Sequence, residues 1–131
     1  MSAAWYRVVD TWANLWFGPT NVGIWKTSLA MELGEHGQAL EVAQAVHPEL
    51  LPNRRQAEFW SQVGCALAAG SKTRHKGVQV LLHAEHLTPQ RIRHDQFVRE
   101  TVAGLLRHVR RDAGARELRN LAWRMGIAPL G

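Results

Sequence analysis

The chain has 131 residues, of which 46% are hydrophobic and 21% charged, and it contains one cysteine. This length predicts a single domain over residues 1–131, and one cysteine excludes both a disulfide framework and a cysteine-based zinc module. Sixteen Lys and Arg against eleven Asp and Glu give a net charge of +5, which favours an acidic partner. No apolar run approaches the roughly 20 residues of a membrane span and no signal peptide is evident, so we expect a cytoplasmic protein.

The excess of basic residues belongs to the last third of the chain. Residues 1–89 carry seven basic and seven acidic side chains, whereas residues 90–131 carry nine arginines and four acidic side chains. A contact with an acidic partner that depends on charge is therefore expected near the C-terminus.

Apolar residues recur every three or four positions along nearly the whole chain, and no segment alternates as a half-buried strand does. The sequence therefore predicts an all-α fold. The first helix, over 5–16, carries an apolar stripe that includes Trp12 and Trp16 and ends at Gly18-Pro19. A second helix, capped by Thr20 or Asn21, runs to Gly34, and a third covers 38–46.

In the second half of the chain, Asn53 and Gln56 have the spacing of a capping box and predict a fourth helix to about residue 68. Residues 70–77 form a polar, basic loop, and a fifth helix covers 78–87, before Pro89. Asp95 is expected to cap a sixth helix, whose predicted apolar stripe is Phe97, Val98, Thr101, Val102, Leu105, Leu106 and Val109. The last helix, over 114–125, buries Leu118, Leu121, Ala122 and Met125 and ends at Gly126.

About seven helices joined mostly by short turns predict antiparallel neighbours, in either a closed bundle or a solenoid of helix pairs. A shift of 41 residues aligns Ala39-Leu40 with Val80-Leu81, as an internal repeat would. The segment 57–67 resembles the first helix of a tetratricopeptide repeat, with Trp60, Val63, Gly64 and Leu67 at its packing positions, and 33–40 resembles the turn of such a repeat. The predicted loop at 70–77 is about four residues longer than that motif has.

A closer resemblance covers nearly the whole chain. Its strings are Phe17-Gly18-Pro19-Thr20-Asn21-Val22, His47-Pro48-Glu49-Leu50, residues 56–60, 87–93, 97–100 and 117–126. Together they are similar to the C-terminal part of actinobacterial helix-turn-helix transcriptional regulators of the XRE type. The resemblance implies a tetratricopeptide-like sensor or interaction domain, which reaches DNA only through a helix-turn-helix domain upstream of Trp5 in a longer protein. We therefore expect a short α-solenoid of stacked antiparallel helix pairs.

Six tryptophans are many for this length, and four of them lie in the first 25 residues. One interpretation is an aromatic groove for a peptide, a protein or a small effector ligand. The other is a packing face that an upstream repeat covers. The candidate groove residues are Trp12, Trp16, Asn21, Trp25 and Trp60, with Arg54, Arg55 and Arg93 as candidates for binding anions.

Other chemistry-bearing residues favour structural roles. His83 and His86 are three apart on one predicted helix, but zinc needs three or four ligands, so a solvated helix face is the favoured interpretation. Cys65 is expected to be a buried thiol rather than a redox sensor. No Ser-His-Asp order, paired carboxylates or phosphate-binding glycine loop is present, so we expect a protein that is not an enzyme and has no cofactor or metal.

The C-terminal arginines allow an alternative function. Arg107, Arg110 and Arg111 lie opposite the apolar stripe of the sixth predicted helix, and Arg116, Arg119 and Arg124 do the same on the last. They could contact nucleic-acid phosphates directly or bind an acidic partner, or they could form an ordinary solvated face. A further alternative is a scaffold that forms a homodimer.

Overall fold

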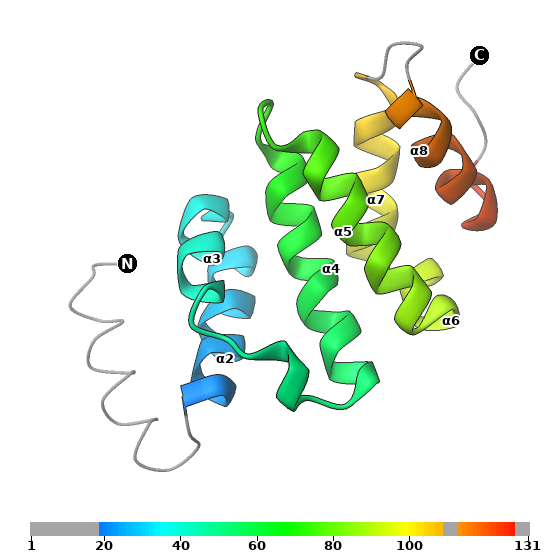
Figure 1. Cartoon of the computed structure of the whole chain (residues 1–131). Helices are drawn as coiled ribbons and strands as arrows, with labels where there is room; N and C mark the ends of the chain where they lie inside the picture. Colours follow the sequence, from blue (N-terminus) through cyan, green and yellow to red (C-terminus); the bar gives the residue numbers. More distant parts are fainter. Residues whose placement is uncertain (1–18, 109–112, 128–131) are drawn as a thin grey trace. The chain divides into compact units, whose positions relative to one another are not determined.

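The computed structural model describes residues 19–108 and 113–127 (Figure 1). Within these ranges it consists of α-helices and one short 3-10 helix, with no strand, which confirms the all-α prediction. The predicted helix over 5–16, with Trp12 and Trp16, lies outside the described residues. The helices are α2 (Pro19–Glu32), α3 (His36–Ala43), η1 (Pro48–Leu50), α4 (Asn53–Ala69), α5 (Arg74–Leu87), α6 (Pro89–Arg93), α7 (Gln96–Leu106) and α8 (Ala113–Arg124).

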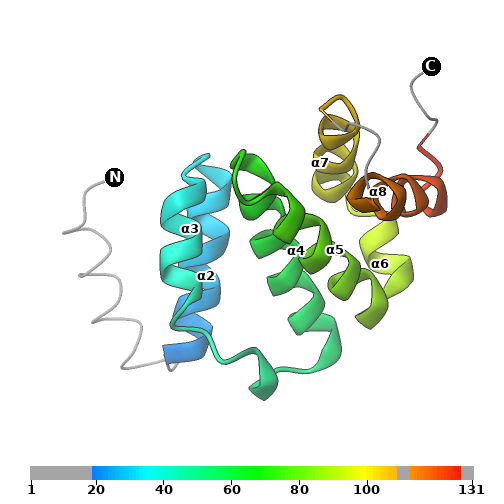
Figure 2. The ribbon, with the colours of Figure 1, turned by 45° about the horizontal axis from the view of Figure 1, so that its top comes forward.

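The chain divides into two compact units, Met1–Leu50 and Leu51–Gly131. In the first unit, α2 and α3 pack side by side in opposite directions (Figure 2). Gly23 on α2 allows a close contact with Val46, which follows α3. A Cβ atom at this position would lie 2.6 Å from Cγ2 of Val46. Thr27 is buried, and its hydroxyl donates to the carbonyl of Gly23 at 2.7 Å.

Both α2 and α8 end with a glycine in the left-handed conformation. Gly34 and Gly126 each have a φ of +74°. The residue that follows each glycine donates its amide to a carbonyl of the last helical turn. Glu35 donates to the carbonyl of Ala30 at 2.8 Å, and Ile127 donates to the carbonyl of Ala122 at 2.9 Å. These are Schellman motifs, which satisfy the last carbonyls of a helix, and both predicted helix ends are confirmed.

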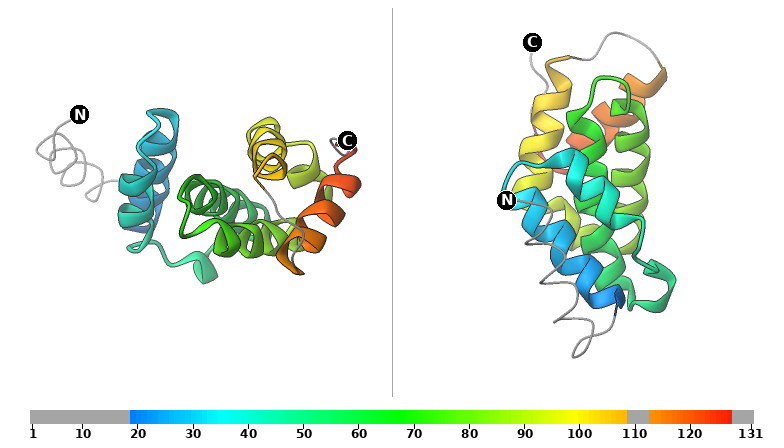
Figure 3. Two further views of the ribbon diagram at one scale, coloured as in Figure 1. Left: turned by 90° about the horizontal axis from the view of Figure 1, so that it is seen from above. Right: turned by 90° about the vertical axis from the view of Figure 1, so that its left-hand side faces the viewer.

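The second unit contains two antiparallel helix pairs, α4–α5 and α7–α8, connected by α6 (Figure 3). Helix α4 contacts α7, and α5 contacts α8, so each helix of one pair packs on its counterpart in the other. The fully buried side chains between them include Leu81, Ile92, Val98, Val102, Leu118 and Leu121. The predicted buried residues of the last helix, Leu118, Leu121, Ala122 and Met125, are all confirmed.

Two glycines allow α4 and α5 to pack closely. A Cβ atom on Gly77 would lie 2.6 Å from the backbone nitrogen of Ala68 and 2.8 Å from the carbonyl oxygen of Gly64. A Cβ atom on Gly64 would lie 2.8 Å from the side chain of Leu81. Because backbone atoms cannot rotate away, Gly77 is the stricter requirement of the two.

Several predicted boundaries were wrong. Helix α5 begins at Arg74, so the connection to α4 is only residues 70–73 and not the predicted loop over 70–77. Neither Thr20 nor Asn21 caps α2, because both already lie within the helix, which is described from Pro19 onward. Helix α3 spans 36–43 instead of 38–46.

The capping box at Asn53 was also wrong. Asn53 is the first helical residue of α4, and its N-cap is Pro52, with no side-chain hydrogen bond. The Gln56 side chain instead donates to the carbonyl of Leu51 at 2.8 Å. By contrast, Asp95 caps α7 as predicted, because its Oδ1 accepts from the amide of Val98 at 3.0 Å.

Two features near α6 and α7 differ from the prediction. Pro89 ends α5 but also begins α6, because proline fits the first position of a helix and Thr88 precedes it as the N-cap. Phe97, placed in the buried stripe of α7, is 46% exposed, whereas Val98, Val102 and Leu105 of that stripe are buried. Val109 lies outside the described residues.

Among the described helices, none is long and apolar enough to cross a lipid bilayer. The buried apolar side chains of the second unit lie between its own helices.

The contact at Gly77 gives a direct test of the α4–α5 packing. We expect Gly77→Ala to lower the free energy of unfolding by about 2–3 kcal/mol, because the new methyl group meets backbone on α4. Gly104→Ala is the matched control. No atom lies within 4 Å of a Cβ there, so the helix-propensity gain of up to about 1 kcal/mol should raise stability. Equal effects of the two substitutions in urea denaturation would contradict this packing.

Candidate functional site

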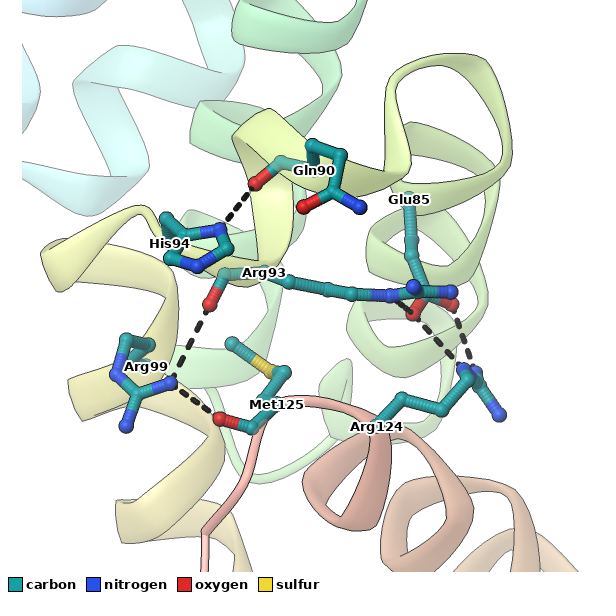
Figure 4. Close-up of polar contacts among 7 residues, drawn as sticks. All are labelled: Glu85, Gln90, Arg93, His94, Arg99, Arg124 and Met125. Carbon is teal, nitrogen blue, oxygen red and sulfur yellow. Dashed lines mark hydrogen bonds and ion pairs between the residues drawn. The ribbon is translucent and has the colours of Figure 1, made fainter.

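The second unit contains a buried carboxylate bound by two arginines from different helices. Glu85, near the end of α5, is 6% exposed. Its Oε2 accepts from Nε of Arg93 on α6 at 2.9 Å and from Nε of Arg124 on α8 at 2.8 Å. Its Oε1 accepts from Nη2 of Arg124 at 2.7 Å, so Arg124 binds through two nitrogens (Figure 4). We call Glu85, Arg93 and Arg124 the arginine clamp.

The clamp decides the protonation state of Glu85. Burial alone would raise the pKa of this carboxyl group, since it disfavours the charged form. The hydrogen bonds and charges of Arg124 and Arg93 outweigh burial and hold the pKa of Glu85 below its ordinary value. Hydrogen bonding to Glu85 in turn raises the pKa of Arg124. Glu85 is therefore ionised near neutral pH and is a weak base.

A third arginine, Arg99, connects α7 to the ends of α6 and α8. Arg99 donates from Nη1 to the carbonyl of Arg93 at 3.3 Å and to the carbonyl of Met125 (Figure 4). It thus binds a carbonyl at the end of α6 and another just after α8, where the negative end of a helix dipole favours a cation. Beside it, Nδ1 of His94 hydrogen-bonds to the carbonyl of Gln90 at 2.7 Å.

The arginine clamp fixes the C-terminal end of α8, and the other side of this helix faces solvent. Arg116, Arg119, Asn120 and Trp123 are all exposed on α8, at intervals of three or four residues that place them on one stripe. We call these four residues the α8 face. Trp123 is 78% exposed, more than the other large hydrophobic side chains of the described residues that reach solvent.

The residues predicted to line a groove are distributed over several helices. Trp25 is 56% exposed on α2, in the first unit. Arg54 and Arg55 are exposed in the first turn of α4, and Trp60, half-buried on the same helix, contacts Phe59 at 5.1 Å and His83 at 5.9 Å between ring centroids. Trp12, Trp16 and the side chain of Asn21 lie outside the described residues. Arg93, predicted to bind an external anion, binds the chain's own Glu85.

The arginines predicted for the alternative function are partly described. Arg107, Arg116 and Arg119 are exposed, and Arg110 and Arg111 lie outside the described residues. Arg124 was placed on the solvated side of its helix, but its side chain is only 31% exposed and turns to Glu85. The attraction of a buried carboxylate explains this difference, because an unpaired Glu85 would be costly.

The remaining titratable candidates have structural surroundings. In the described ranges, no group of three or more His, Cys, Asp and Glu side chains is placed to hold a metal ion. Cys65 is buried on α4, and burial is the main cause that raises the pKa of its thiol to about 12. The thiol is therefore protonated at neutral pH, which makes it a poor nucleophile.

Two important residues were not among the predicted site residues. Glu85 follows Val78 and Leu81 at helical spacing, so the pattern of α5 already places it on the buried side. A carboxylate there requires a cation, and this signal could have identified the clamp. Trp123 lies off the buried stripe of α8, and the spacing from Arg116 and Arg119 could have identified the α8 face.

Comparison with known proteins found no matching family model, no matching curated protein and no matching solved structure.

The clamp makes stability depend on pH in a specific direction. Folding lowers the pKa of Glu85, so the ionised carboxylate stabilises the folded state. Its contribution to the free energy of unfolding is complete above the unfolded-state pKa of about 4.3 and is lost as the pH falls through the lower folded-state pKa. We expect Glu85→Gln to cost about 2 kcal/mol at pH 7, less than for a fully buried pair because both arginine side chains are 31% exposed. The difference from wild type should shrink below about pH 4.

The control is Glu58→Gln, since Glu58 pairs with Arg91 but both side chains are more than 40% exposed. We expect it to change stability by less than about 1 kcal/mol. Urea denaturation at a series of pH values measures both variants. A Glu85→Gln variant whose stability falls with acid as steeply as that of wild type would show that the clamp is not the cause.

Proposed function

We propose that this chain is a non-enzymatic, tetratricopeptide-like interaction module of a cytoplasmic transcriptional regulator, which binds a peptide or protein partner in a groove lined by its helices. The observation that carries the proposal is the packing of the second unit, in which α4 contacts α7 and α5 contacts α8. Two successive helix pairs that pack on each other in this way are typical of stacked repeats. The sequence resemblance to regulators of the XRE type supports the same interpretation.

Two further features support the proposal. The connection between α4 and α5 is only residues 70–73. The loop predicted at 70–77 was about four residues longer than the loop of a tetratricopeptide repeat, and this difference is absent from the structure. The close approach at Gly64 and Gly77 explains why small residues occupy these positions.

Selection from a displayed random-peptide library tests the proposal. We expect selected peptides to bind with micromolar dissociation constants and to raise the melting temperature. The double variant Arg54→Ala/Arg55→Ala should weaken binding about fivefold, because it removes two exposed cations from the first turn of α4 that are candidates for binding anionic groups of the peptide. The double variant Lys72→Ala/Lys76→Ala removes the same charge from another exposed segment and should change affinity by less than about twofold. If no peptide is enriched, or both double variants act equally, the groove is not supported.

One observation favours a second candidate function, direct binding of nucleic acid. Residues 51–131 contain fourteen Lys and Arg against six Asp and Glu, and Arg107, Arg116 and Arg119 are exposed. A DNA duplex titrated across a salt series should then show a steep loss of affinity, by about 0.9 log units per log unit of salt for each phosphate contact. Replacing Arg107 with Gln should reduce that slope. No binding to a duplex at low salt would exclude this function.

A further inference from the structure

We propose that the α8 face, formed by Arg116, Arg119, Asn120 and Trp123, docks an acidic amphipathic helix of a partner protein. This inference does not depend on the groove proposed above, because it uses only residues of α8. It begins from the side-chain types, because tryptophan and arginine are the residues that most often dominate the energy of protein interfaces. On α8 they lie together on a side that faces solvent, at 78% exposure for Trp123.

The spacing on the α8 face suits a helical partner. Arg119 and Arg116 precede Trp123 by four and seven residues, which is about 6 Å and about 10.5 Å along the helix axis. A partner helix with carboxylates one and two turns from an apolar residue repeats these intervals. Its apolar residue would cover the indole ring while its carboxylates meet the two guanidinium groups.

Charge favours an acidic occupant. The unit that contains α8 has a net charge of +8 over residues 51–131, and the α8 face itself has two cations and no carboxylate. Complementary charge of this kind accelerates association and selects against basic partners. The apolar ring of Trp123 adds surface that is removed from water on binding.

A protein helix fits this face better than a nucleic-acid duplex. Two arginines supply few phosphate contacts compared with the six to ten of a typical DNA-binding surface. A large apolar ring beside two cations is more useful for a contact with an apolar side chain than for one with duplex phosphates.

The arginine clamp holds the α8 face in place. Arg124, which binds Glu85 through two nitrogens, is the residue after Trp123, and Arg99 binds the carbonyl of Met125, two residues after Trp123. The end of the helix is therefore fixed to α5 and α7 before any partner arrives. Preorganisation of this kind lowers the entropy cost of binding.

A synthetic amphipathic peptide tests the proposal with the full chain. The probe is an 18-residue helical peptide of Glu, Leu and Ala with Glu on one stripe beside Leu, and the control peptide has Lys in place of each Glu. Isothermal titration should show micromolar binding of the acidic peptide at 150 mM salt and none of the basic peptide. Trp123→Ala should weaken binding about tenfold, and Arg116→Gln/Arg119→Gln about as much.

Matched controls separate this face from general electrostatic attraction. Lys72→Gln/Lys76→Gln removes the same charge from the exposed start of α5 and the turn before it, and should change affinity by less than about twofold. Because Trp123 is exposed, its variant should keep the wild-type melting temperature within a few degrees, and circular dichroism checks this.

Three results would overturn the proposal. The first is acidic-peptide binding that the Trp123 and Arg116/Arg119 variants leave unchanged, or no binding at all. The second is a 20-base-pair duplex that binds more tightly than the peptide and loses affinity in the same variants, which would assign the face to nucleic acid. The third is self-association of the chain in sedimentation that Trp123→Ala abolishes, which would assign the face to a second copy.

Discussion

The carboxylate of Glu85 is the group on which the arrangement of the second unit depends. It is buried at the end of α5 and is bound by Arg93 from α6 and by Arg124 from α8. The apolar contacts of Leu118 and Leu121 hold α8 against the core but have no fixed direction. The charge-assisted hydrogen bonds have a fixed direction, so they hold the C-terminal turn of α8 against α5 and α6 and fix which of its residues face solvent. The position of Trp123 follows from this constraint.

Much of the fold follows from local sequence signals. Asp95, Gly34 and Gly126 each require only neighbouring backbone groups, and all three act as helix ends as predicted. The errors fall where local signals compete. Pro89 can either stop a helix or begin one, and it does both. Asn53 could have been an N-cap, but it is the first helical residue of α4 and Pro52 occupies the N-cap position. The basic residues of 74–77 look like a loop by composition but form the first turn of α5.

The candidate site was harder to predict, because it depends on contacts between distant residues. Arg124 lies 39 residues from Glu85, and nothing in the spacing within α8 distinguishes it from the exposed Arg119. Periodicity places Glu85 on a buried side but does not identify its partners. The groove residues were chosen by type, and Trp25, Trp60 and Arg93 belong to different surroundings in the structure.

A double-mutant cycle between Glu85→Gln and Arg124→Met measures the central interaction most directly. It compares the free energy of unfolding of wild type, both single variants and the double variant at pH 7. If the clamp positions α8, the coupling energy should be about 1.5–3 kcal/mol, as for a charge-assisted hydrogen bond with a buried carboxylate. A coupling energy near zero would contradict the account, because α8 would then be held by its apolar side chains alone.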